Sequence, residues 1–187
     1  MVITNLFRSE KLRLVALNPE QDAQLMNQWR RDTEYARLLD SDPVRLFNKE
    51  ENKKWVEKMQ KKETFDGIEF MIYALPEDKP IGFVGLDGIN WHNGVSWVGI
   101  GIGEREYWSK GFGSEAMRMI ARYAFEELGL HRISLNVFSY NTRAIRSYEK
   151  VGFKIEGKIV EAVHRDGQRW DVVFMGLLRD DWINAQK

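Results

Sequence analysis

Hydrophobic and polar residues alternate along several segments of the chain, and elsewhere they repeat with helical spacing. Alternation predicts strands over residues 11–17, 68–75, 81–90, 95–103, 131–139, 153–165 and 168–178. After Gly113, apolar residues recur at helical intervals, at Met117, Ile120, Ala121, Ala124, Phe125 and Leu128. Shorter helices are expected over 18–30, from Asn48 onward, and over 141–151. The predicted order is therefore β-α-α-β-β-β-α-β-α-β-β.

Polar residues at the starts of the first two helices have the spacing of capping boxes. Asn18 and Asn48 are expected to cap these helices, with Gln21 and Glu51 three residues later. The second helix carries an apolar face, made of Trp55, Val56 and Met59. Residues 31–47 show no regular pattern and are expected to be irregular.

The long helix lies between two strands, and this arrangement constrains the topology. A strand–helix–strand crossover in one sheet joins parallel strands, whereas hairpins such as the one across Asp166-Gly167 join antiparallel strands. The expected fold class is therefore α/β (α+β), with a mixed sheet of seven strands flanked by about four helices. One domain is expected over residues 11–178, with residues 1–10 and 179–187 as short terminal extensions.

Composition removes several classes of function. Twenty-eight basic and 28 acidic side chains give a net charge of zero, which argues against a nucleic-acid or membrane partner held by bulk charge. The absence of cysteine removes disulfides, thiolate metal sites and a cysteine nucleophile. The three histidines have no ligand-like partners, so no metal is expected. No signal peptide or transmembrane stretch is recognised, so a cytoplasmic protein is expected.

Gly111 and Gly113 stand where the long helix must begin, an unusual place for flexible residues. One interpretation is a tight loop without further role. A second is a dinucleotide fingerprint, because Gly111-x-Gly113-x-x-Ala116 fits G-x-G-x-x-[GA]. That fingerprint should directly follow the first strand of a βαβ unit, whereas EREYWSK intervenes here and the following strand ends without an acidic residue for a ribose.

A third interpretation is a cradle for phosphate groups. Backbone N–H groups at a helix N-terminus bind phosphate oxygens, and glycines allow close approach to the backbone. A lysine within the segment adds a positive charge. The residues predicted to hold a pyrophosphate are Ser109, Lys110, Gly111, Phe112, Gly113 and Ser114.

Two segments carry a family resemblance. WSKGFG, residues 108–113, resembles the pyrophosphate loop of the GNAT N-acetyltransferases, Arg/Gln-x-x-Gly-x-Gly/Ala, although Trp108 replaces the Arg or Gln. Tyr-Trp-x-Lys-Gly-x-Gly looks like the branch typified by ribosomal-protein N-terminal acetyltransferases and spermidine acetyltransferase. Residues 141–153 are similar to the family's Asn-x-x-Ala-x-x-x-Tyr-x-x-x-Gly-Phe. The strand order also agrees over residues 11–178.

The resemblance implies acetyl-CoA as co-substrate and a sheet that splays between its fourth and fifth strands. It implies that Ile100, Gly101 and Ile102 on the fourth strand contact the pantetheine arm. Asn141 and Ala144 match cofactor-contacting positions of the second signature. Asn141 is equally suited to cap its helix.

Tyr148 matches the family's general acid. Acetyl transfer to an amine runs through a tetrahedral intermediate, and the departing thiolate needs a proton, which a phenol with a pKa near ~10 can supply. Glu104, just past the fourth strand, is the candidate acceptor of the amine proton. The plainer interpretations are a core aromatic for Tyr148 and a solvated surface acid for Glu104.

The resemblance places the acceptor amine among the first two helices, the loop between them and the last hairpin. These segments mix aromatic and basic residues with the acids Glu34, Asp40, Asp42, Glu161 and Asp171. A polyamine site should be dominated by carboxylates, so a protein N-terminus, a small-molecule amine and an amino-sugar all remain open, as does a homodimer.

The leading hypothesis is an acetyl-CoA-dependent N-acetyltransferase that acts on a primary amine. A non-catalytic acyl-CoA-binding or regulatory module on the same fold is the alternative. A nicotinamide-dependent oxidoreductase and acyl transfer to an alcohol are further hypotheses.

Overall fold

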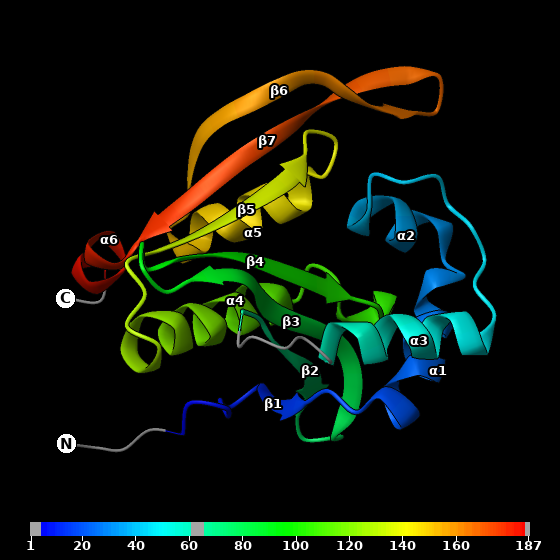
Figure 1. Cartoon of the computed structure of the whole chain (residues 1–187), viewed down its shortest axis with the longest axis horizontal. Helices are drawn as coiled ribbons and strands as arrows, with labels where there is room; N and C mark the ends of the chain where they lie inside the picture. Colours follow the sequence, from blue (N-terminus) through cyan, green and yellow to red (C-terminus); the bar gives the residue numbers. More distant parts are fainter. Residues whose placement is uncertain (1–4, 61–65, 186–187) are drawn as a thin grey trace.

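The computed structural model describes residues 5–60 and 66–185 (Figure 1). The predicted apolar face of Trp55, Val56 and Met59 lies outside the described side chains. The strands are β1 (Leu12–Ala16), β2 (Ile68–Ala74), β3 (Lys79–Asn90), β4 (Val95–Ile102), β5 (Arg132–Phe138), β6 (Lys154–Arg165) and β7 (Gln168–Leu178). The α-helices are α1 (Pro19–Arg30), α2 (Thr33–Leu39), α3 (Lys49–Gln60), α4 (Phe112–Arg122), α5 (Thr142–Val151) and α6 (Arg179–Asn184).

The seven strands form one mixed sheet in the order β1-β2-β3-β4-β5-β7-β6, which confirms the predicted fold class. The pair β4–β5 is parallel, and the other neighbouring pairs are antiparallel. Pairing between β4 and β5 starts at Val95 and Arg132 and reaches no further than Trp97 and Ser134. The two strands therefore separate toward their carboxyl ends, and the predicted splay is confirmed.

Helices cover both faces of the sheet. The main core lies between the sheet and α4, whose side chains Met117, Ile120 and Ala121 are almost completely buried. A second core on the opposite face packs α1 and α2 against β2 and β3, with Trp29 and Tyr35 among its buried residues. The helices α1, α2 and α3 thus gather beside β1–β4, and the β6–β7 hairpin projects on the other side of the splay (Figure 1).

The predicted capping residues of α1 and α3 are largely confirmed by the structure. Asn48 and Glu51 form a reciprocal capping box, each backbone N–H donating to the other's side chain at 2.9 Å. Asn18 caps α1 as predicted, but its own N–H donates at 2.6 Å to Asp22, not to Gln21. One residue of further helical rotation brings the acid into reach.

The prediction of irregular structure over residues 31–47 is wrong, because α2 occupies part of it. Asp32 caps this short helix by accepting hydrogen bonds from the N–H groups of Glu34 and Tyr35. Burial of Tyr35 in the second core stabilises the helix. Seven residues give too few turns for a clear periodicity.

The estimate of about four helices is also too low, since the described residues form six α-helices. The last, α6, falls in the segment expected to be a terminal extension. Trp182 of α6 is 7% exposed, and its ring lies 5.5 Å from that of Phe125, centroid to centroid. Lys154 of β6 also pairs with Asp181 at 2.8 Å. The C-terminal segment is therefore part of the packed structure.

Candidate active site

A cavity of about 700 Å³ opens where β4 and β5 separate. Its walls come from α2, β3, β4, the segment leading to α4, β5 and α5. Ten of the predicted site residues line it: Ile100, Gly101, Ile102, Ser109, Gly111, Gly113, Ser114, Asn141, Ala144 and Tyr148. The splay therefore brings the two sequence signatures together in one site.

The predicted phosphate cradle has the backbone geometry of an anion site. Ser109 and Gly111 both adopt left-handed conformations, with φ of 60° and 88°. The first hydrogen bond of α4 runs from Glu115 N–H to Gly111 C=O at 3.0 Å. The three preceding amide groups, from Phe112 to Ser114, open the helix and carry its positive dipole end. Phosphate oxygens fit this arrangement.

Glycine is needed at the two positions of the cradle for different physical reasons. Gly111 is required by its positive φ, and a Cβ there would meet the protein no closer than 3.8 Å, at Lys11. Gly113 has an ordinary φ, and a Cβ on it would lie 3.9 Å from both Ile102 and Ser147. Gly113 therefore keeps open a space that the protein itself does not fill.

Trp108, which departs from the family pattern, braces the same loop. Its indole Nε1–H donates to the carbonyl oxygen of Ile102 at 2.7 Å and so ties the loop to the end of β4. The guanidinium of Arg143 lies 3.8 Å from the centroid of its ring, within cation–π distance. The tryptophan thus positions an arginine from α5 beside the cradle.

Arg143 is a cavity residue that the sequence reasoning missed. It lines the cavity, and burial lowers the pKa of its guanidinium below the ordinary value. No carboxylate of the described residues forms an ion pair with it. A partly desolvated cation in this position attracts an anion. Ser147, Arg146 and Lys150 also line the cavity from α5, and only the helical position of Ala144 and Tyr148 hinted at them.

The start of α5 is capped by Asn141, and α5 is joined to α4 by a pair of serines. The side chain of Asn141 accepts a hydrogen bond from the N–H of Ala144 at 3.2 Å, so it caps α5 while lining the cavity. The hydroxyl oxygens of Ser114 and Ser147 lie 2.7 Å apart. The serine pair therefore links the two signatures directly.

Tyr148 lies on the cavity side of α5, and its ring also packs near Phe153, 6.1 Å between centroids. Burial raises the pKa of Tyr148 to about 12. Its hydroxyl therefore stays protonated at neutral pH, as a proton donor requires.

The position of Glu104 does not suit its predicted role as acceptor of the amine proton. Its two carboxylate oxygens accept hydrogen bonds from Trp29 Nε1 at 2.8 Å and Lys79 Nζ at 2.9 Å. Burial alone would raise the pKa of Glu104, but these two hydrogen bonds hold it below the ordinary value. The carboxylate lies outside the lining of the cavity. The geometry gives its assignment as a base no support and makes it a structural anchor for α1.

Lys110 and Phe112 also lie outside the cavity lining. Lys110 is exposed, whereas the ring of Phe112 packs edge-on against Tyr107, 5.0 Å between centroids, at the main core. Within the cradle, Phe112 can contribute its backbone N–H alone.

The glycines of β4 mark the face that α2 approaches. A Cβ on Gly101 would lie 2.6 Å from the Tyr35 hydroxyl and 2.9 Å from Phe83, so packing of α2 requires this glycine. A Cβ on Gly99 would meet nothing within 4 Å. Gly99 therefore leaves open the part of the strand next to the cavity.

The far end of the cavity is built mostly from residues that the sequence reasoning did not select; Tyr35, Leu38 and Leu39 alone lie in a segment that was expected to hold the acceptor. The residues at this end are Tyr35, Leu38, Leu39, Phe83, Asp87, Trp97, Asn136 and Phe138. They come from four elements, one of which was expected to be irregular. The strand alternation could have placed Trp97 and Phe138 on one face, but not beside α2.

Within the described residues, no group of three or more His, Cys, Asp or Glu side chains could hold a metal ion. None of the helices in this part of the chain is long and apolar enough to cross a membrane.

Residues 11–154 match the family described as the Acetyltransferase (GNAT) domain. The SPbeta prophage-derived uncharacterized N-acetyltransferase YokL of Bacillus subtilis (strain 168) is 30% identical over 176 residues, covering 92% of this chain and 93% of that protein. The uncharacterized N-acetyltransferase p20 of Bacillus licheniformis is 33% identical over 113 residues, covering 60% of this chain and 63% of that protein.

Among solved structures, spermidine N-acetyltransferase from Vibrio cholerae in complex with CoA and spermine is similar, with a TM-score of 0.82 and 25% identity over 94% of this chain and 100% of that one. The chain belongs to the GNAT acetyltransferase family. The resemblance seen in the two sequence signatures is thereby confirmed.

Proposed function

We propose that the protein is an acetyl-CoA-dependent N-acetyltransferase that moves an acetyl group directly to a primary amine. One observation carries the proposal: the glycine segment before α4 and Tyr148, whose phenol stays protonated, line the same cavity where β4 and β5 separate. Bound acetyl-CoA would supply the thioester whose acetyl group is transferred.

The cradle residues bind and orient the cofactor. Amide groups at the start of α4 and the left-handed turns at Ser109 and Gly111 face its pyrophosphate, and Arg143 adds charge beside them. Ile100, Gly101 and Ile102 form the wall along which the pantetheine arm extends, with Asn141 and Ala144 opposite. An N–H of β4 serves as hydrogen-bond donor to the developing oxyanion.

Tyr148 supplies the proton. As the amine nitrogen forms its bond to the acetyl carbon and the carbon–sulfur bond breaks, the phenol donates its proton to the departing sulfur. The proton that the nitrogen loses passes to solvent water, and the phenolate regains a proton from solvent. The raised pKa of Tyr148 keeps the proton on the phenol until that step. The surrounding apolar side chains reduce competing reaction with water.

The first experiment is calorimetry of the purified chain with acetyl-CoA and, separately, with NADH. Saturable binding of acetyl-CoA without binding of NADH is expected. Amines are then screened by release of free thiol, with mass spectrometry of the product. Binding of acetyl-CoA with no acetylated amine would favour a non-catalytic module, and an O-acetylated product would indicate an alcohol acceptor.

The acceptor is a small-molecule amine in this proposal. The name of the Vibrio cholerae structure, a spermidine N-acetyltransferase bound to spermine, supports an amine of this size. A protein N-terminus is the second candidate, because it offers the same primary amine and the branch resemblance includes ribosomal-protein acetyltransferases.

A further inference from the structure

The strand residues at the acceptor end of the cavity lie on one face of the sheet, as the strand register shows. Trp97 of β4 pairs with Ser134 of β5 in the parallel ladder, so the two side chains point to the same face of the sheet. Alternation then places Gly99 on that face of β4, and Asn136 and Phe138 on that face of β5. This is the face that α2 covers, as the contacts of Gly101 with Tyr35 show.

Aromatic and aliphatic groups dominate this face. Tyr35, Leu38 and Leu39 reach the cavity from α2, and Phe83, Trp97 and Phe138 reach it from the sheet. Further rings lie behind the wall, with Tyr140 stacked on Phe138 at 5.3 Å between centroids. An acceptor that enters here meets mainly apolar surface.

Negative charge is sparse at the cavity. Asp87 is the one carboxylate among the described residues that line it, whereas Arg143, Arg146 and Lys150 also line it. Asp87 stands opposite Trp97 in the β3–β4 ladder. The described lining thus contains one carboxylate, which lies beside the exposed tryptophan.

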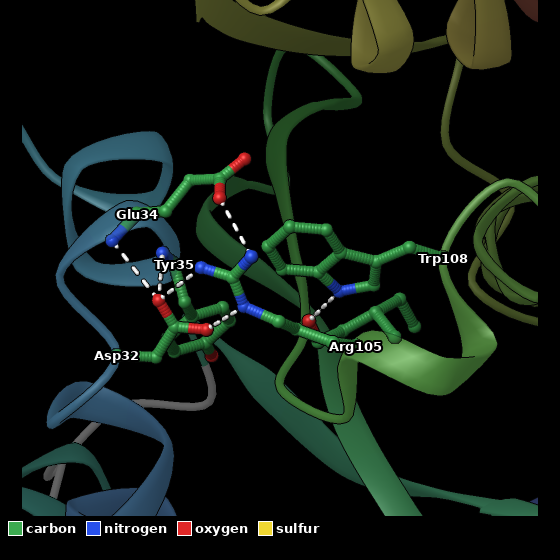
Figure 2. Close-up of polar contacts among 6 residues, drawn as sticks. Asp32, Glu34, Tyr35, Arg105 and Trp108 are labelled. Carbon is green, nitrogen blue, oxygen red and sulfur yellow. Dashed lines mark hydrogen bonds and ion pairs between the residues drawn. The ribbon is translucent and has the colours of Figure 1, made fainter.

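The acidic side chains at the start of α2 pair with Arg105 and do not line the cavity. Figure 2 shows the guanidinium of Arg105 pointing to the carboxylates of Asp32 and Glu34. Arg105 donates to one oxygen of Asp32 at 2.7 Å and pairs with Glu34 at 2.7 Å. Asp32 also caps α2. These two acids are therefore used to fix α2 to the segment that precedes the cradle.

The other acids expected near the acceptor are likewise occupied or displaced. Asp171 pairs with Lys158 at 2.7 Å, and Glu161 lies outside the cavity lining. Asp166 at the hairpin tip, an acid that was not among those expected, pairs with Arg37 at 2.8 Å. Asp40 and Asp42 line a separate cavity of about 250 Å³. No cluster of carboxylates remains at the main cavity among the described residues.

We infer that the acceptor is a monoamine whose primary amine is attached to an aromatic or branched apolar body, and that polyamines are poor acceptors. Burial of the apolar body against α2 and the aromatic wall stabilises the complex. A polyamine would leave several desolvated ammonium groups without carboxylate partners among the described residues that line the cavity. The inference rests on the proposed acetyl transfer and specifies its substrate class.

Competing amines test this inference directly. Phenylethylamine, spermidine and a short peptide with an N-terminal phenylalanine are compared at saturating acetyl-CoA. Because one phenyl group is buried and the described residues place no cluster of carboxylates at the cavity, kcat/KM for phenylethylamine should exceed that for spermidine by roughly tenfold or more. A preferred peptide would assign the same chemistry to a polypeptide terminus.

Equal or faster acetylation of spermidine would overturn the inference and leave the proposed function standing. Binding of acetyl-CoA without acetylation of any amine would overturn both.

An isosteric variant adds the missing charge. Asn136→Asp places a second carboxylate in the cavity without changing the shape of the side chain, and should raise kcat/KM for spermidine while lowering it for phenylethylamine. Gln24→Glu adds the same charge on the exposed surface of α1 and should leave the ratio unchanged. An unchanged ratio in Asn136→Asp would contradict the inference.

Leu38→Glu, compared with Leu38→Gln, repeats the test from α2. Both variants remove apolar contact, but only the glutamate should favour spermidine. Equal ratios in the two variants would also contradict the inference. Affinity for acetyl-CoA is measured for every variant, so that loss of folding is recognised.

Discussion

The two ends of the cavity are assembled from different parts of the chain. The cofactor end takes its phosphate-binding groups from two continuous segments, residues 109–114 and 141–148, beside residues 100–102 of β4, and depends on backbone N–H groups and helix starts. The acceptor end gathers side chains from α2, β3, β4 and β5, which are up to about a hundred residues apart in sequence, as from Tyr35 to Phe138. The acetyl group of the cofactor and the amine of the acceptor must nevertheless meet where these two ends join.

This difference explains why one end can be recognised in the sequence and the other cannot. A phosphate cradle needs a short run of residues with particular φ values, such as Ser109 and Gly111, so its pattern is local. An apolar wall can be made from many combinations of side chains. Substrate class is therefore carried by the tertiary arrangement, and cofactor class by short motifs.

The largest expected effect is at Tyr148, where the two ends meet. Tyr148→Phe removes the proton donor and keeps the ring, so kcat should fall by about a hundredfold or more, with affinity for acetyl-CoA unchanged. Steady-state kinetics and calorimetry on the same preparation separate the two quantities. An unchanged kcat would exclude Tyr148 as the acid.

The pH dependence of the wild-type enzyme gives a second view of the same residue. An acid acts while it is protonated, and a pKa raised to about 12 keeps Tyr148 protonated throughout the ordinary assay range. The rate should therefore show no loss at alkaline pH from ionisation of this phenol up to about pH 10. A descending limb near pH 9 that disappears in Tyr148→Phe would contradict the raised pKa.

Gly113→Val tests the cofactor end alone. The added side chain occupies space that the protein leaves open, so affinity for acetyl-CoA should fall roughly 10- to 100-fold through lost amide–phosphate hydrogen bonds. Gly157→Val on β6 is the matched control, because a Cβ there meets nothing within 4 Å and Gly157 does not line the cavity. Comparable affinity in the two variants would refute the cradle.

Trp108→Phe sharpens the comparison further. The ring stays available to Arg143, but the hydrogen bond to the carbonyl of Ile102 is lost. One such bond contributes about 1 kcal/mol to the order of the loop, so the affinity for acetyl-CoA should become weaker by at most about fivefold. Trp97→Phe, at the acceptor end, should instead leave that affinity unchanged. Calorimetry of acetyl-CoA binding to both variants decides whether Trp108 belongs to the cofactor end of the cavity and Trp97 to the acceptor end. Equal loss of affinity in the two variants would contradict this separation.

The smallest effect is expected at Asp32, which joins α2 to the segment before the cradle. Asp32→Ala removes the cap of α2 and should lower the free energy of unfolding by about 1 kcal/mol. Asp32→Asn keeps the cap but not the ion pair with Arg105, so its loss should be smaller. Urea unfolding followed by circular dichroism measures both.

Acid pH should remove the difference between wild type and Asp32→Asn. The hydrogen bond from Arg105 holds the pKa of Asp32 below its ordinary value of 3.8. A lowered pKa in the folded state stabilises the protein above pH 3.8, and this contribution is lost as the pH falls through the folded-state value. A constant difference between the two proteins from pH 7 to pH 3 would contradict the role of the pair.

The sequence by itself determined features that depend on neighbouring residues. The Asn48–Glu51 capping box is made by groups three residues apart, and the Asp166-Gly167 turn takes the two positive φ values that its residue types favour. The glycine loop follows from the same local physical reasons. Each structure needs only a short piece of chain to satisfy its own hydrogen bonds.

Tertiary structure alone decided α2, the partners of Glu104 and the apolar acceptor wall. Glu104 contacts Trp29 and Lys79 because the sheet register and the packing of α1 bring the three side chains together. The residues next to Glu104 in the sequence do not predict those contacts. Side-chain pairing across distant elements depends on how whole surfaces pack. For that reason the short motifs defined the cofactor, while the assembled cavity defined the chemical character of the acceptor.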